Sequence, residues 1–158
     1  MKPQSVSAPT EDDLDRLAKQ VLFIYELAQR HWGSNGALNG TASDLPVLQR
    51  LLDDNVFQSN QTWELQSLGL AFGSVLSTST GLDWVTVEDE YGRDPALAYP
   101  GTSLIVYPLT MVSKRVEAGE AVDLRHLHER VVSDVAALKG RAPESPVAPP
   151  RKSKWRLW

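Results

Sequence analysis

Apolar residues recur at helical spacing in several segments of the chain. From Leu14 to Ala28 they fall three and four positions apart, which places their side chains on one face of a helix. Thr10 precedes this segment as a candidate N-cap, and three acidic residues follow it at the positive end of the helix dipole. The pattern therefore predicts a first helix that ends near Trp32 and packs its apolar stripe inward.

Two more helices are predicted before the middle of the chain. Asp44 and Pro46 mark the start of a short second helix, and the segment from Trp63 to about Ser77 has the spacing of a third. Gly69 and Gly73 lie inside the third helix, where each glycine costs about 1 kcal/mol of helix propensity. We therefore expect another element to approach this helix closely.

The second half of the chain begins with strand patterns and ends with helical ones. The segment from Trp84 to Tyr91 alternates with a period of two, which is typical of a strand. Turn residues then separate two more predicted strands, over 96–99 and 103–107, and the apolar run in the second makes it the strand expected to be best covered. Helices are predicted over 109–118 and from an N-cap at Asp123 to Gly140.

These elements define an α+β fold class. We expect a three-stranded antiparallel meander covered by about five helices. Residues 1–9 are polar and contain two prolines, so they are predicted to be a disordered lead-in. Residues 10–140 form the predicted single α+β domain. Residues 141–158 are predicted to be a proline-rich linker followed by a basic and aromatic tail.

Composition narrows the class of protein. The 158 residues include no cysteine, which excludes disulfides, thiolate metal ligands and cysteine nucleophiles and fits a reducing, cytoplasmic compartment. No apolar stretch is long enough for a transmembrane segment. The chain has 16 basic and 20 acidic residues, but four of the basic ones lie in the last eight positions. The remainder is acidic, so no specific nucleic-acid binding is expected.

Charged side chains cluster in two stretches of the second half. Lys114 and Arg115 could pair with carboxylates of the strand, and we favour a structural salt-bridge network whose candidate members are Asp89, Glu117, Glu120 and Asp123. The alternative is the site of a small enzyme or ligand-binding domain, because paired carboxylates can act as general acid and base. That site would be built from Trp84, Glu88, Glu90, Lys114 and Arg115.

Recognisable catalytic and metal-binding motifs are missing. The sequence contains no nucleophile elbow, no P-loop and no dinucleotide-binding glycine motif. His126 and His128 are two positions apart on a predicted helix, so they do not share a face, and His31 is better explained by a helix C-terminus. We therefore assign no catalytic residue, no metal site and no cofactor, and we lean against enzymatic activity.

Two aromatic features could bind a partner. Trp84 shares its predicted strand face with Glu88 and Glu90, so it either anchors a partner on an exposed sheet face or is buried under the first helix. The tail could make weak contacts with anionic surfaces, or it could fold back onto the acidic body of its own chain. Its candidate contact residues are Arg151, Lys152, Lys154, Trp155, Arg156 and Trp158.

Between Trp63 and about Val135 the sequence contains a run of motifs: Trp63-x-Leu65-Gln66-x-Leu68-Gly69-x-Ala71-Phe72-Gly73, Gly81-Leu82-x-Trp84-x-x-Val87-x-Asp89-Glu90-Tyr91-Gly92, Tyr99-x-Gly101-Thr102, Tyr107-Pro108 and Lys114-Arg115-x-Glu117-x-Gly119-Glu120-x-x-Asp123. With these motifs the stretch resembles a bacterial domain-of-unknown-function family, numbered 3806. The resemblance implies a bacterial origin and an α+β fold, and it transfers no catalytic residue.

The expected function is that of a non-catalytic protein-interaction module. An acidic strand face suits a basic partner surface, as in immunity or inhibitor proteins that mask a toxin or nuclease. The identity of the protein partner does not follow from the sequence.

Overall fold

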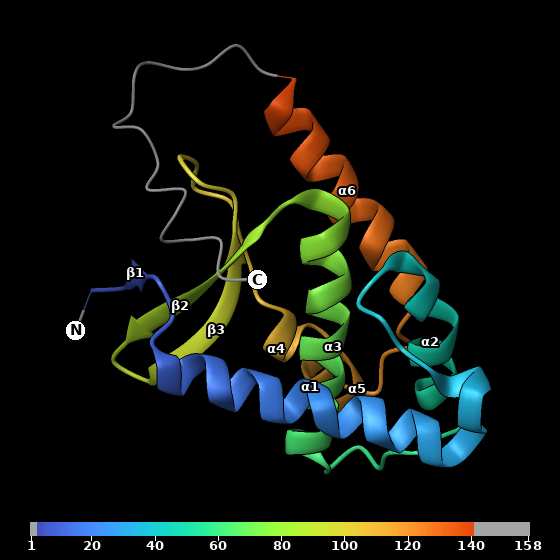
Figure 1. The fold of residues 1–158 in the computed structure, drawn as a ribbon. Coiled ribbons are helices and arrows are strands. Elements are labelled where there is room, and N and C mark those ends of the chain that lie inside the picture. The colour runs from blue at the N-terminus through green and yellow to red at the C-terminus, as the bar shows by residue number, and fades with distance from the viewer. Residues whose placement is uncertain (1–2, 141–158) are drawn as a thin grey trace.

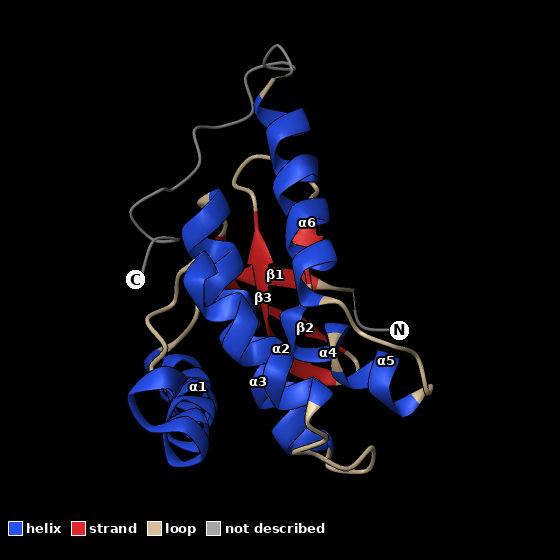
Figure 2. Ribbon diagram, turned by 90° about the vertical axis from the view of Figure 1, so that its right-hand side faces the viewer, coloured by secondary structure: helices blue, strands red, loops and turns tan. Residues whose placement is uncertain are grey.

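The computed structural model describes residues 3–140. Its helices lie on one side of a curled, four-stranded antiparallel sheet (Figures 1 and 2). The order of the strands in the sheet follows their order in the sequence. The strands are β1 (Ser5–Ser7), β2 (Asp83–Asp89), β3 (Gly92–Ala98) and β4 (Ile105–Val106).

The α+β class is confirmed, and the strand count is corrected from three to four. The additional strand is β1, which lies within the expected disordered lead-in and pairs with β2 through Val6 and Val87. A three-residue Ser-Val-Ser segment is too short to show alternation, so the pattern gave no signal for it. β3 also begins earlier than expected, because Arg93, Asp94 and Pro95 lie in the strand rather than in a turn.

The helices follow the sequence pattern closely. α1 begins with a capping box, in which the Thr10 hydroxyl accepts from the backbone N–H of Asp13 and the Asp13 carboxylate accepts from the backbone N–H of Thr10. The predicted helix over 109–118 is divided into α4 and α5 at Val112. The helices are α1 (Glu11–Trp32), α2 (Leu45–Asp53), α3 (Thr62–Thr80), α4 (Pro108–Met111), α5 (Ser113–Glu117) and α6 (Leu124–Lys139), with 3-10 turns η1 (Gly33–Gly36) and η2 (Ala42–Asp44).

The main core lies between the helices and the inner face of the sheet. α3 runs through it and is buried along most of its length (Figure 1). The close approach expected at its glycines is confirmed: a Cβ on Gly69 would collide with the backbone carbonyl of Pro108, and one on Gly73 would lie 2.7 Å from the Trp84 ring. The glycines therefore allow α3 to contact both the start of α4 and the inner face of β2.

The strand expected to be best covered is the shortest one. β4 has two residues and forms one edge of the sheet, with Ile105 only partly buried. The apolar run around it is explained by its neighbours: Leu104 and Val106 pack against the helical core, while Ile105 points to the other face. The run is therefore apolar because its residues pack against both faces of the sheet, although β4 lies at the edge of the sheet and not at its centre.

Candidate functional site

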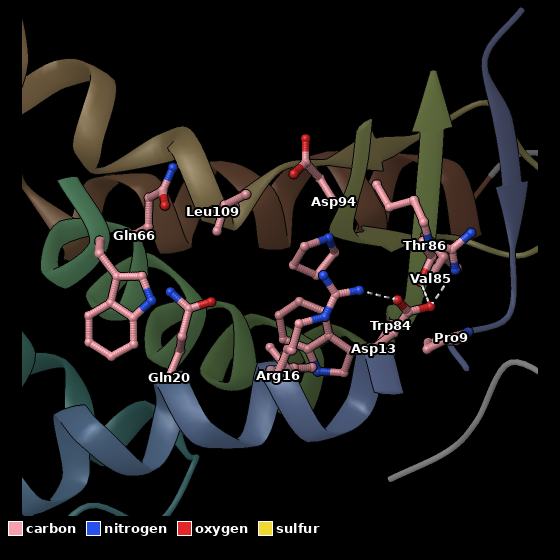
Figure 3. Close-up of a pocket in the computed structure, with 14 residues that line it drawn as sticks. Pro9, Asp13, Arg16, Gln20, Gln66, Trp84, Val85, Thr86, Asp94 and Leu109 are labelled. Carbon is pink, nitrogen blue, oxygen red and sulfur yellow. Dashed lines mark hydrogen bonds and ion pairs between the residues drawn. The ribbon is translucent and has the colours of Figure 1, made fainter. Parts of the chain in front are cut away.

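The N-terminal turn of α1 and the β2–β3 hairpin are joined by one carboxylate, Asp13. Its side chain is 10% exposed and accepts from Arg93 at 2.6 Å, from Thr86 at 2.9 Å and from Arg16 at 2.9 Å (Figure 3). Burial alone would raise the pKa of Asp13, but hydrogen bonds from the Thr10 backbone, Arg93 and Thr86 outweigh it and hold the pKa far below its usual value. Asp13 is therefore a charged residue that connects α1 to the β2–β3 hairpin, and we call it the Asp13 hub.

A hollow of about 190 Å³ opens beside this hub. Its walls come from α1, the start of α3 and the strands β2 and β3 (Figure 3). Trp63 and Trp84 are among the residues that line it. Gln20, which donates to Ser67 at 3.0 Å, and Gln66 add amide groups. The hollow can accept a small polar group. Two carboxylates line it, Asp13 and Asp94, and Asp13 is paired with Arg16 and Arg93.

Trp84 does not lie on an exposed sheet face. It is 3% exposed, and its ring packs against Gly73 in the main core, so the expectation of an exposed partner anchor is corrected in favour of burial. The physical reason is that α1 covers this face: Thr86, two residues on, is also buried and donates to Asp13.

The five residues of the predicted enzyme or ligand site are not brought together. Trp84 lines the hollow beside α1, whereas Lys114 and Arg115 line a second hollow with Tyr107, Arg130 and others of β4, α4 and α6. Arg115 donates to the backbone carbonyl of Met111 at 2.7 Å. Periodicity could not reveal this separation, because it follows from the placement of α5 relative to the sheet.

The acidic residues serve different local purposes. Glu88 pairs with Arg93 at 3.5 Å, the Asp89 carboxylate accepts from the backbone N–H of Tyr91, and Glu90 is exposed in the turn. Farther along the chain, Glu117 accepts from the Thr62 hydroxyl, Asp123 caps α6 by accepting from the backbone N–H of His126, and Glu120 is exposed.

The tip of the β2–β3 hairpin is the most exposed aromatic position in the described chain. Tyr91 is 89% exposed, whereas the other exposed large apolar side chains reach at most 55%. We define the hairpin tip as residues 89–92. The sequence pattern placed Tyr91 both at the end of the strand and at the start of the turn before Gly92, and the structure places it in the turn.

The other features considered from the sequence are His128, a metal site, a membrane-spanning helix and the C-terminal tail. The His128 ring lies 2.8 Å from the Ser79 hydroxyl, and burial lowers the pKa of this histidine despite the nearby Glu129. Within residues 3–140, no group of three His, Cys, Asp or Glu side chains is placed to hold a metal ion. No helix in the same range is long and apolar enough to cross a membrane. The predicted tail contacts, Arg151 to Trp158, lie outside the described residues.

Fold and site together define an α+β domain in which the five side chains of the alternative enzyme or ligand-binding site are spread over separate surfaces. The family model of a domain of unknown function, DUF3806, matches residues 44–128, which is more than half of the chain, and the protein belongs to that family. The match confirms the resemblance seen in the motifs around α3, β2 and α5.

A solved structure from Bacteroides thetaiotaomicron VPI-5482 has a similar fold. The TM-score is 0.77 at 16% identity, over 85% of this chain and 49% of that one. This chain therefore spans about half the length of the structure it matches, and at such an identity the likeness concerns the fold alone. Among curated proteins, none matches the chain.

Proposed function

We propose that the chain is a non-catalytic protein-interaction module that presents the hairpin tip to a basic surface of a protein partner. The observation that carries the proposal is the exposure of Tyr91, at 89%, beside the exposed carboxylate of Glu90. Tyrosine is enriched among residues that dominate binding energy, because its ring supplies contact area at a small entropic cost. The proposal includes a bacterial, cytoplasmic setting.

The base of the hairpin supports this role by holding the tip in place. Arg93 pairs with both Asp13 of α1 and Glu88 of β2, and Asp89 fixes the turn through the backbone N–H of Tyr91. A side chain that is exposed on an anchored turn loses less conformational freedom when it binds than one on a free loop. The carboxylates around it favour a basic partner and disfavour an acidic one.

The first experiment is affinity purification from the native host, followed by measurement of the dissociation constant for each protein recovered. Tyr91→Ala and Glu90→Lys are compared with Leu22→Ala and Glu26→Lys, which alter an exposed leucine and an exposed acid on α1. We expect Tyr91→Ala to weaken binding by about thirtyfold, the loss typical of a dominant interface residue. The α1 controls should leave it unchanged.

Two outcomes would contradict the proposal. Equal losses in the hairpin and α1 variants would mean that Tyr91 is not the contact. Loss only when the chain is ended at Gly140 would assign binding to the residues beyond α6. Circular dichroism of each variant separates both outcomes from a failure to fold.

A further inference from the structure

A second hollow, of about 420 Å³, lies between the edge strand β4 and α6. We call it the β4–α6 hollow. Residues 104–107 line it from the strand, and α4 and α5 contribute further lining residues. From α6 come Leu127, Arg130, Val131 and Asp134, whose spacing of three and four places them on one face of the helix. Small-molecule sites in proteins occupy clefts of roughly 300–1,000 Å³, so this hollow has room for a ligand.

The base of the β4–α6 hollow is apolar. Val106, Leu127 and Val131 line it and belong to the main core, and they are 7–9% exposed. Leu104 and Met111 also line it and are partly buried against the same core. An apolar group that enters the hollow would therefore displace water from an apolar surface, which is favourable.

Cations surround this apolar base, although the chain outside its last eight residues has an excess of acids. Lys114, Arg115 and Arg130 line the hollow, against Asp134 as the one carboxylate among its described lining residues. No ion pair joins Lys114 or Arg130 to a described residue. Arg115 donates through one terminal nitrogen to the backbone carbonyl of Met111, which leaves its other N–H groups. These cations are available to an anion from outside the chain.

A hydroxyl donor is also among the lining residues. The Tyr107 hydroxyl accepts from the side-chain amide of Gln4 at 2.7 Å, so its own proton remains available for donation. A carboxylate accepts hydrogen bonds from hydroxyl, ammonium and guanidinium groups, and an arginine can bind both of its oxygens in parallel. The hollow thus combines donors for one carboxylate with an apolar surface.

We propose that the β4–α6 hollow binds a small organic carboxylate that has an apolar body. The carboxylate binds Lys114, Arg130 and the Tyr107 hydroxyl, and the body lies on the apolar base. Asp134 disfavours a ligand with several negative charges, because like charges repel in a partly desolvated site. This site goes beyond the proposed function and uses no residue of the hairpin tip.

The test uses octanoate as the probe on the full chain, followed by calorimetry and by methyl NMR. Octanamide has the same apolar body without the charge, and acetate has the charge without the body. We expect octanoate to shift the methyl signals of Val106, Met111 and Val131, while those of Leu22 and Leu52 stay in place. Octanamide and acetate should bind at least about tenfold more weakly, the loss of a charged hydrogen bond or of the apolar contact.

Charge reversal on α6 provides a matched pair of variants. Arg130→Glu should weaken octanoate binding by about tenfold or more. Arg125→Glu makes the same change at an exposed arginine of the same helix that does not line the hollow, and it should leave the affinity unchanged. Lys114→Glu on α5 is a second variant of the site and should act like Arg130→Glu. Circular dichroism checks that each variant is folded.

Several results would overturn the proposal. Equal affinities for octanoate and octanamide would mean that the carboxylate is not recognised, and equal losses in Arg130→Glu and Arg125→Glu would reflect overall charge alone. Shifts of Leu22 and Leu52 as large as those in the hollow would indicate non-specific binding. If octanoate moves no methyl signal, the hollow is not a carboxylate site, and loss of a recovered protein partner in Arg130→Glu would then assign it to a protein segment. The ligand titrations do not involve the partner of the hairpin tip.

Discussion

At the residue scale, Asp13 both caps α1 and binds two residues of the β2–β3 hairpin. The pattern identified it as one of three acids at the positive end of a helix, and the Thr10-x-x-Asp13 spacing was the available signal for a capping box. Its bonds to Thr86 and Arg93 join residues more than 70 positions away. Local patterns contain no information about such distant partners. The helix cap at Thr10 could therefore be predicted from the sequence, whereas the contacts of Asp13 with Thr86 and Arg93 could not.

The first prediction concerns the pH dependence of this hub. Because the folded state holds the pKa of Asp13 below its value of about 3.9 in an unfolded chain, the stabilisation is present above about pH 4 and is lost as the pH falls further. Asp13→Asn should lower the free energy of unfolding at pH 7 by about 1–2 kcal/mol, the size of a lost charged hydrogen bond. Urea titrations from pH 7 to pH 3 measure the difference.

The difference between the two proteins should shrink toward pH 3, because Asp13 then takes up a proton in the unfolded chain while the folded state, with its lowered pKa, resists protonation. A difference that stays constant over the whole range would show that the hub stabilises the fold through its hydrogen-bond geometry rather than its charge. Asp12→Asn, which alters an exposed neighbour in the same turn, is the matched control and should change little.

At the element scale, α3 shows which features a sequence pattern can supply. Spacing predicted a helix from Trp63 to about Ser77, and α3 covers Thr62–Thr80. The close approach expected at its small residues Gly69 and Gly73 is confirmed. The identity of the approaching element, Pro108 at the start of α4, could not be predicted. Tertiary packing determines which segment lies in the groove that Gly69 and Gly73 leave on the surface of α3. Tertiary packing also explains why the apolar run around Ile105 forms only a two-residue edge strand.

The second prediction concerns Gly73, where α3 contacts Trp84 and Pro108. In Gly73→Ala the new methyl group would lie 2.7 Å from the Trp84 ring and 2.8 Å from the Pro108 ring, so one of them must move. We expect a net loss of about 1–3 kcal/mol from overpacking, even though alanine favours the helix. Thermal unfolding followed by near-ultraviolet circular dichroism reports both the stability and the environment of Trp84.

Gly140→Ala provides the comparison. A Cβ at that position would meet its nearest neighbour, the Ala136 carbonyl oxygen, at an ordinary 3.5 Å, so its stability should change by only a few tenths of a kcal/mol. Equal effects of the two substitutions would contradict the assignment of Gly73 to a packing role.

At the scale of the whole molecule, the sheet depends on its N-terminal edge. β1 covers one edge of β2 and is followed directly by α1, so the two ends of the described sheet come from the start and the middle of the chain. The sequence predicted the central β2–β3 pair and the class of fold. It missed β1 because three residues that are all exposed carry no periodic signal.

The third prediction is that deleting residues 1–9 exposes the edge of β2 while leaving the Thr10 cap intact. Unpaired backbone groups on a strand edge invite pairing with another chain, so the shortened protein should be less stable and should associate as its concentration rises. Sedimentation velocity at several concentrations measures this. Val6→Lys in the full chain keeps the backbone pairing and should remain monomeric at the concentrations where the deletion associates.

The pair formed by Asp13 and Arg93 also bears on how the chain assembles. These residues are 80 positions apart, and closing a flexible loop of that length costs roughly 4 kcal/mol of entropy. One partly exposed ion pair cannot supply that amount, so it cannot begin the folding of this chain. The helices around α3 and the β2–β3 hairpin must first bring the two ends together, which makes the pair a late step that completes the fold.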